Sequence, residues 1–323
     1  PWQGQIWMVS RKSGEARLVT KELSSYTKIA SANGNLLTVQ RTTVSHIRIA
    51  DFDEKAKTLQ AREIYRESGI ISSVAWANDN RILYFSNDGG KPEIWRMQID
   101  GTNPEQLTVN ANASFGMSVS PIDGSLVFCS TVDGKHALQI TDSEGRNMRR
   151  LTEGTEDVFP NFTPDGKSVI FQRGLNDKTL TLWRYDLADG KITRLTETQA
   201  SHPAVSPDGA QIAYYFMDRE TDNLWRVGLI SSLNGDFFGK VNLPPKITDR
   251  RMRWHPSGRF LTQIFYTGEN ASLLLLPLDG GNGLEVPGLG KGDVNWFEWS
   301  QNGKNLIASQ TNVSRDIVLI KDF

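Results

Sequence analysis

Apolar residues along the chain gather in short runs bounded by turn-forming residues. Typical runs are residues 82–85, 169–171 and 212–215, with Gly, Pro, Asp or Asn within a few positions on either side. Strands of four to six residues give this pattern, and no stretch repeats with the 3.6-residue period of an amphipathic helix. The pattern predicts an all-β chain and excludes helical bundles and α/β folds.

One turn motif, most clearly Ser/Thr-Pro-Asp-Gly, recurs at an almost constant spacing. Its copies begin at Ser31, Ala77, Ser120, Thr163, Ser206, His255 and Ser300. Pro presets φ for the turn, and Asp and Gly accept its remaining conformations, so each copy predicts a tight hairpin. Successive copies are 43 to 49 residues apart, close to the period of a propeller blade. The seven copies predict a seven-bladed β-propeller.

Each copy also carries the signals of a third and a fourth strand. The third strand holds an aromatic and an arginine, as in residues 94–96, 182–184 and 224–226. The fourth ends in Leu-Thr, at residues 107–108, 151–152 and 195–196. Four strands per copy predict four-stranded antiparallel blades.

The two ends of the chain supply parts of the same copy. Residues 295–299, 305–309 and 316–320 read as its first three strands, and residues 5–9 and 16–20 read as a third and a fourth strand. We therefore expect residues 16–20 to close the ring as the outer strand of the last blade. Residues 6–9 and 317–320 compete for one place in that blade, and the sequence does not choose between them. An alternative is six blades plus extra strands.

These repeats resemble the TolB-type WD40-like β-propeller family, on the evidence of the turns, the Ile/Leu-Trp-Arg strands and the Leu-Thr strand ends. The final ten residues are similar to the C-terminus of large bacterial proteins of that group. The resemblance implies a single propeller domain over residues 1–323, as a fragment of a longer protein. It implies a periplasmic or extracellular sensor or interaction module of a signalling protein, tethered through a transmembrane segment outside these residues. The effector domain upstream would be a serine/threonine kinase or a winged-helix domain.

Charge and composition limit the classes of partner that we expect for this chain. The 36 basic and 37 acidic residues give a formal net charge of -1, so we expect no nucleic-acid partner and no general attraction to anionic surfaces. No apolar run approaches the roughly 18 residues that span a bilayer, so direct membrane insertion is not expected. Cys129 is the single cysteine and lies in the apolar run 126–129, where we expect a buried hydrophobe rather than a reactive thiol.

The sequence offers little catalytic chemistry. A Gly-x-Ser-x-Gly elbow and a His-Glu-x-x-His helix are both absent. Of the four histidines, only His202 falls on a loop that enters an innermost strand, so we expect no metal, no cofactor and no enzymatic activity. The alternative class is a carbohydrate-active lyase or hydrolase acting at the channel mouth.

We expect binding where loops feed the innermost strands, because repeated positions serve packing and differing positions serve function. Aligning the copies on their turns gives a ring of aromatic and basic candidates, which are residue types enriched in binding hot spots. The ligand candidates are Tyr26, Phe115, Phe159, His202, Arg250, Arg251 and Trp296. Their expected ligand is a protein, peptide or glycan. The competing interpretation is that the aromatic members fill gaps between blades.

Two further features have alternative interpretations. Arg253 follows two other arginines, but it is equivalent to Glu298 in the neighbouring copy, so we expect these two to pair. The insertion at residues 231–245 carries Phe237 and Phe238. These two are either a partner-docking tip or a cover for the edge of their blade.

Overall fold

The computed structural model describes residues 4–20, 25–87, 90–154, 156–175, 179–244, 251–279 and 281–321. These residues form 27 β-strands and no helix. The all-β prediction is confirmed.

Five sheets follow the predicted blade order, with each strand paired antiparallel to the next. Blade 1 contains β6 (Val74–Trp76), β7 (Ile82–Ser86), β8 (Glu93–Met97) and β9 (Glu105–Gln106). Blade 2 contains β10 (Ala113–Val119), β11 (Leu126–Val132), β12 (Lys135–Thr141) and β13 (Arg149–Arg150). Blade 3 contains β14 (Asp157–Phe162), β15 (Ser168–Gly174), β16 (Leu180–Asp186) and β17 (Ile192–Arg194). Blade 4 contains β18 (Ser201–Val205), β19 (Gln211–Asp218), β20 (Leu224–Ser231) and β21 (Phe237–Asn242). Blade 5 contains β22 (Met252–Trp254), β23 (Phe260–Thr267), β24 (Asn270–Pro277) and β25 (Leu284–Lys291).

A sixth sheet joins the two ends of the chain. Its strands are β26 (Asp293–Trp299), β27 (Asn305–Lys321), β4 (Asn35–Asp53), β5 (Thr58–Ser68) and β3 (Ser25–Ala32). β4 pairs with β27 along its length from Asn35 to Asp51, with β5 from Val44 onward, and with β3 before Thr42. The sequence β26–β27–β4–β5 is thus a blade, which we call the closing blade. It lies between blades 5 and 1, because β5 contacts β25 and β26 contacts β6.

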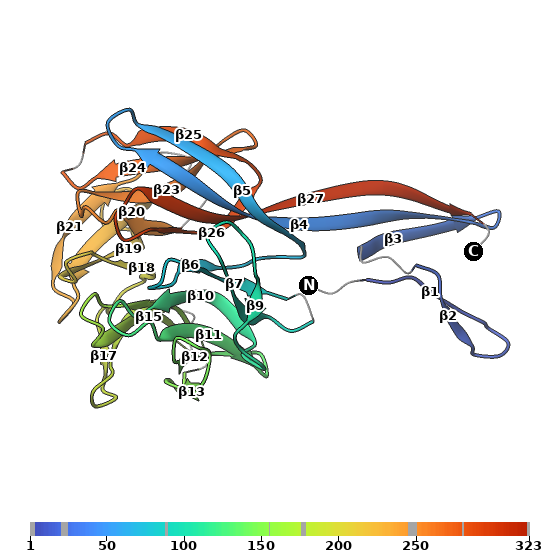
Figure 1. Cartoon of the computed structure of the whole chain (residues 1–323), viewed down its shortest axis with the longest axis horizontal. Coiled ribbons are helices and arrows are strands. Elements are labelled where there is room, and N and C mark those ends of the chain that lie inside the picture. The colour runs from blue at the N-terminus through green and yellow to red at the C-terminus, as the bar shows by residue number, and fades with distance from the viewer. Residues whose placement is uncertain are drawn as a thin grey trace.

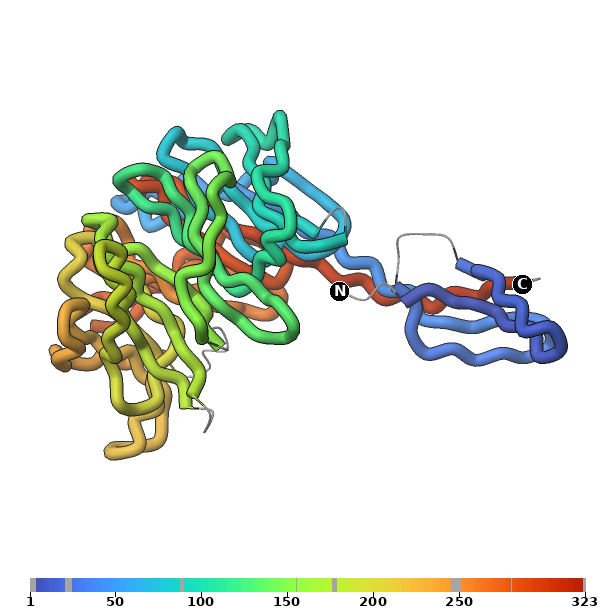
Figure 2. Tube along the Cα trace, turned by 90° about the horizontal axis from the view of Figure 1, so that it is seen from below, coloured from blue at the N-terminus to red at the C-terminus, as the bar shows by residue number. Residues whose placement is uncertain are grey.

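The remaining strands form an arm that projects from the side of the ring (Figure 1, Figure 2). We define the arm as β1 (Trp7–Val9), β2 (Ala16–Leu18), β3, and the outer parts of β4 and β27 at residues 35–43 and 312–321. Among the described strands, β1 and β2 pair with each other and with no other strand. Ile6, Tyr26 and Leu36 form a small core that fixes the hairpin to one face of the arm.

The prediction of seven blades is wrong for the described residues, which form six blade sheets. The turn at Ser31 lies at the tip of the arm, as the connection between β3 and β4. Residues 16–20 do not close the ring, because β2 pairs with β1. Neither residues 6–9 nor residues 317–320 supply the third strand of the closing blade, which is the inner part of β4.

The error has a physical cause in the links between second and third strands. Other copies turn there through residues that accept turn geometry, such as Asp133-Gly134 and Gly268, all with positive φ. The corresponding residues of β4 are Arg41, Thr42, Thr43 and Val44, with three β-branched side chains that favour extended structure. β4 therefore continues straight for 19 residues, and β27 runs beside it.

The repeated signatures have clear structural roles. In the turn at Thr163, the hydroxyl donates to Asp165 at 2.6 Å and the backbone N–H of Gly166 donates to the Thr163 carbonyl at 2.9 Å. The threonines of the Leu-Thr strand ends are buried and accept the N–H of a third-strand residue. These bonds join Thr108 to Ile94, Thr152 to Leu138 and Thr196 to Leu182, at 2.9 to 3.0 Å. The spacing that recurs from copy to copy thus places a threonine hydroxyl where it accepts a hydrogen bond from a buried backbone N–H of strand three.

The hydrophobic core lies between neighbouring blades rather than within one sheet. Its largest fully buried side chains include Tyr84, Phe128, Phe171, Tyr215 and Phe297, one from each of five blades. The innermost strands β26, β6, β10, β14, β18 and β22 contact one another in succession. This ring holds the loops at one end of the propeller in fixed positions.

Candidate functional site

The innermost strands carry β-bulges near the end where the chain enters them. The register shifts in β10 after Ser114, in β14 after Val158, in β18 after Ser201 and in β26 after Val294. A bulge re-aims the side chain of the extra residue and is common beside binding sites. These bulges therefore set the direction of the residues that line the mouth of the propeller.

Three of the bulged residues have an unusual backbone conformation. Phe115, Phe159 and His202 have φ values of 45°, 55° and 53°. Bulky side chains rarely adopt this left-handed region, and such residues persist only where the surrounding fold holds them. In three successive blades the first residue of the bulge has this conformation, so the strain is a feature of the mouth and not of a single loop.

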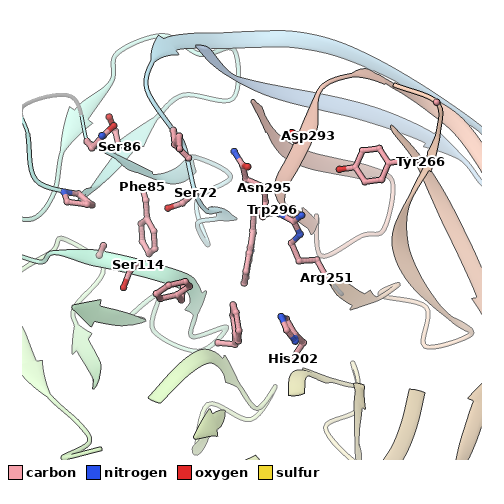
Figure 3. Close-up of a pocket in the computed structure, with 17 residues that line it drawn as sticks. Ser72, Phe85, Ser86, Ser114, His202, Arg251, Tyr266, Asp293, Asn295 and Trp296 are labelled. Carbon is pink, nitrogen blue, oxygen red and sulfur yellow. Dashed lines mark hydrogen bonds between the residues drawn. The ribbon is translucent and has the colours of Figure 1, made fainter. Parts of the chain in front are cut away.

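These side chains border a cavity of about 1080 Å³ at the mouth (Figure 3). Its lining includes five of the seven predicted ligand candidates: Phe115, Phe159, His202, Arg251 and Trp296. The volume is that of a site for a small ligand or a peptide side-chain cluster. The structure thus brings these five together, and their role in binding stays a prediction.

Aromatic rings form the floor of the cavity. Phe159 stacks on His202 with ring centroids 4.5 Å apart, and on Trp296 at 6.1 Å. Trp296 reaches across from the closing blade and is 6% exposed. Its ring fills the space beside Gly116 of blade 2, where an added Cβ would lie 2.6 Å from it. Phe115, at 47% exposure, is the accessible member of the group.

A charged pair lies directly under this floor. Arg253 Nε donates to Glu298 Oε2 at 2.7 Å, and the guanidinium lies 4.4 Å from the Trp296 ring centroid. The predicted pairing of Arg253 with Glu298 is confirmed. The pair also lines a second cavity at the opposite end of the channel, so Trp296 separates the two ends.

Polar groups surround the upper wall of the mouth cavity. Arg251 donates from Nη1 to the carbonyl of Asn295, and the Asn295 amide donates to the Ile71 carbonyl at 3.0 Å. Among the described lining residues, Arg251 and Asp293 are the charged side chains, apart from His202. Small hydroxyls complete the wall, from Ser72, Ser86 and Ser114. The wall can therefore offer several hydrogen bonds with little net charge.

Other lining residues were not among the sequence candidates. Phe85 and Ser86 end β7 and Asn87 follows them in the link to β8, whereas Tyr266 lies near the end of β23 and Gly268 in the link to β24. These links join second to third strands at the same end as the entering loops. Blade topology alone could have placed them there, because in a four-stranded meander both connections lie at one end.

Two of the predicted ligand candidates do not line the mouth cavity of the described structure. The expected position of Tyr26 at the mouth is wrong, because Tyr26 lies on β3 and is buried in the arm core. Arg250 falls outside the described residues. Phe237 and Phe238 lie on β21, the outer strand of blade 4, and each is 58% exposed. Phe237 pairs with Ile230 in the sheet, and a docking role for either ring stays a prediction.

The histidines and the cysteine have separate surroundings. His136 contacts Thr131 at 2.9 Å and packs edge-on against Phe115, whereas His46 contacts Glu63 and His255 contacts the Gly303 carbonyl. Within the described part of the chain, no group of three or more His, Cys, Asp or Glu could hold a metal ion. Cys129 is fully buried, and burial raises the pKa of its thiol to about 12. Across the described residues, no helix is long and apolar enough to cross a membrane.

The fold and the mouth cavity define a β-propeller with a binding-sized site at one end of its channel. Residues 54–182 match the family described as TolB beta propeller domain. This match confirms the resemblance seen in the repeats.

Individual relatives agree with this assignment. The chain is 29% identical over 184 residues to an uncharacterized protein of Agrobacterium fabrum, covering 52% of this chain and 61% of that protein. It is 26% identical over 218 residues to the Tol-Pal system protein TolB of Francisella tularensis, covering 51% and 49%. The chain thus spans about half to three-fifths of these relatives. A solved structure described as a TolB from Agrobacterium tumefaciens superposes with a TM-score of 0.69 at 22% identity, over 84% of this chain and 99% of that one.

Proposed function

We propose that this chain is a non-catalytic binding module that captures a protein or peptide segment at the mouth of the propeller. The observation that carries the proposal is the set of three strained bulges at Phe115, Phe159 and His202. Strain of this kind costs of order 1–3 kcal/mol per residue. A fold that needed only a filled channel would not require it, since ordinary strand geometry can also place apolar side chains there.

The lining favours a peptide over a small charged metabolite. Phe115 offers an exposed ring for an apolar side chain, and Ser72, Ser114 and Asn295 offer hydrogen-bonding groups suited to a backbone. Arg251 adds a fixed cation for a carboxylate or a carbonyl. A glycan could stack on the same rings, so it is the second ligand class to test. The name of the Francisella relative, a Tol-Pal system protein, also supports a protein partner.

The setting of this module is part of the same proposal. We place it in the periplasm or outside the cell, as the sensor or interaction part of a bacterial signalling protein joined to an upstream effector domain. A carbohydrate-active enzyme receives less support, because glycoside hydrolysis generally uses two carboxylates. Asp293 is the carboxylate among the described lining residues.

The proposal is tested with the paired changes Phe115→Asn and Arg251→Gln. Asn tolerates the left-handed backbone at position 115, so the fold is kept while the exposed ring and the cation are removed. Ligand is sought in an envelope extract and in peptide and glycan arrays. We expect capture by the paired variant to fall by roughly 30-fold, as for an interface hot spot.

The matched control is Ile122→Asn with Arg149→Gln. Ile122 is 68% exposed and borders the opposite end of the channel. This control should bind as the unchanged chain does. Equal capture by the mouth variant and the unchanged chain would exclude the mouth as the binding site.

A further inference from the structure

One face of the arm is an open sheet of apolar and basic side chains. Residues directly opposite in antiparallel strands share a face, and the register pairs Leu37 with Leu319, Val39 with Ile317 and Thr43 with Val313. The same face carries Arg41 opposite Arg315, and Lys321 opposite Asn35. We call this surface the basic face of the arm.

The two faces of the arm differ in how well they are covered. Leu36, on the other face, is 5% exposed under Ile6 and Tyr26. On the basic face, Ile317 is 77% exposed, Leu319 51% and Leu37 46%. Monomeric proteins rarely leave neighbouring large aliphatic side chains in water without a binding role.

The charges of this face indicate an anionic partner. Arg41 and Arg315 lie directly opposite each other, and like charges in that position destabilise a strand pair. The one acidic residue of the outer part of β27, Asp316, pairs with Gln40 and so points to the other face. An anion between the two arginines would remove the repulsion.

The arm as a whole is basic although the chain is not. Its described residues 4–20, 25–43 and 312–321 hold seven basic and two acidic side chains, a net of +5, against -1 for the whole chain. The basic residues are Arg11, Lys12, Arg17, Lys28, Arg41, Arg315 and Lys321. The local charge therefore departs strongly from the composition.

We propose that the basic face of the arm docks on the surface of an anionic lipid bilayer. The cavities at the two ends of the channel are lined by residues of the ring, whereas this face of the arm is an open surface of paired strands. Aliphatic side chains flanked by cations bind the interface between headgroups and acyl chains.

A second copy of this chain fits the surface less well. Stacking two basic faces would bring four arginines together and increase the repulsion already present within one arm. Docking on a bilayer leaves the arm at the surface and does not span it. The residues of the basic face do not line the mouth cavity, so this inference stands apart from the proposed binding function.

The test uses the whole chain and vesicles of phosphatidylcholine with or without phosphatidylglycerol. We expect binding to the anionic vesicles that weakens as salt is raised, and much weaker binding to pure phosphatidylcholine. Arg41→Gln with Arg315→Gln should lower the partition coefficient by roughly 25-fold, from the usual contribution of a basic residue near an anionic surface. Ile317→Ser with Leu319→Ser should lower it as well.

Matched controls make the same chemical changes on the ring. Arg149→Gln with Lys135→Gln removes two exposed charges, and Ile122→Ser with Val109→Ser removes two exposed aliphatic side chains. These controls should bind vesicles as the unchanged chain does. Equal binding by arm and ring variants would overturn the proposal. So would absence of vesicle binding, including the case in which the arm variants instead convert a dimer to a monomer.

Discussion

Single residues at the mouth show how a repeat fold acquires a specific site. Phe115, Phe159 and His202 are each the first residue of a bulge, and each adopts positive φ. The next residue in blade 2 is Gly116, which leaves room for the Trp296 ring. The repeat thus supplies a common backbone distortion, while the side chains supply the individual chemistry of each blade.

The ion pair under the aromatic floor gives the first prediction at this scale. Arg253 and Glu298 are 12% and 31% exposed and bonded at 2.7 Å, so loss of either partner leaves a half-buried charge. In a double-mutant cycle of Arg253→Met and Glu298→Gln, we expect a coupling of about 0.5 to 3 kcal/mol in the free energy of unfolding. Additive effects of the two changes, measured by denaturant unfolding, would show that the pair does not stabilise the channel.

Sequence reasoning worked for the pairs and positions that the repeat itself defines. Arg253 and Glu298 could be paired because they occupy equivalent sites in neighbouring copies, and five mouth residues could be placed for the same reason. Tyr26 could not be placed in this way, because its strand, β3, lies in the arm and not in a blade of the ring. The stacking of Phe159 on His202 and Trp296 depends on bulge geometry, which no local pattern in the chain indicates.

At the scale of elements, the first and last copies share their strands. The inner strands of the last copy, β26 and the start of β27, pair with the outer strands of the first copy, the end of β4 and β5. The remaining parts of both copies form the arm. Seven turn motifs were visible in the sequence, but whether a link turns or continues depends on a few residues, such as Thr42 and Thr43.

This arrangement predicts the effect of removing residues 1–20. Of these residues, the described 4–20 supply Ile6 to the arm core and the paired strands β1 and β2, so we expect the melting temperature of the ring to change by no more than about a degree or two. The comparison is Leu59→Ala on β5, which opens a cavity in the closing blade and should cost about 2–5 kcal/mol. If the truncated chain were as unstable as the Leu59 variant, residues 16–20 would have to be a strand of the ring after all.

At the scale of the whole molecule, the chain has three distinct regions: the two ends of the propeller channel and the arm. The mouth holds the strained aromatic residues and the opposite end holds the repeated turns. The arm, which projects from the ring (Figure 1), carries the basic face. The all-β class and the blade unit followed from hydrophobic pattern and turn chemistry. The arm did not, because its existence depends on pairing between residues almost 300 positions apart, such as Asn35 with Lys321.

The central claim is that ligand binds at the mouth, and site-specific photo-crosslinking tests it most directly. A photoreactive phenylalanine analogue is placed singly at Phe115 at the mouth, Ile122 at the opposite end and Phe237 on the rim of blade 4. All three positions are more than half or nearly half exposed, at 47%, 68% and 58%, so the probe should not disturb folding. In envelope extract, we predict a discrete adduct from position 115 that free ligand or the Arg251→Gln change suppresses, and none from position 122. An adduct from position 122 or 237 without one from position 115 would contradict the account.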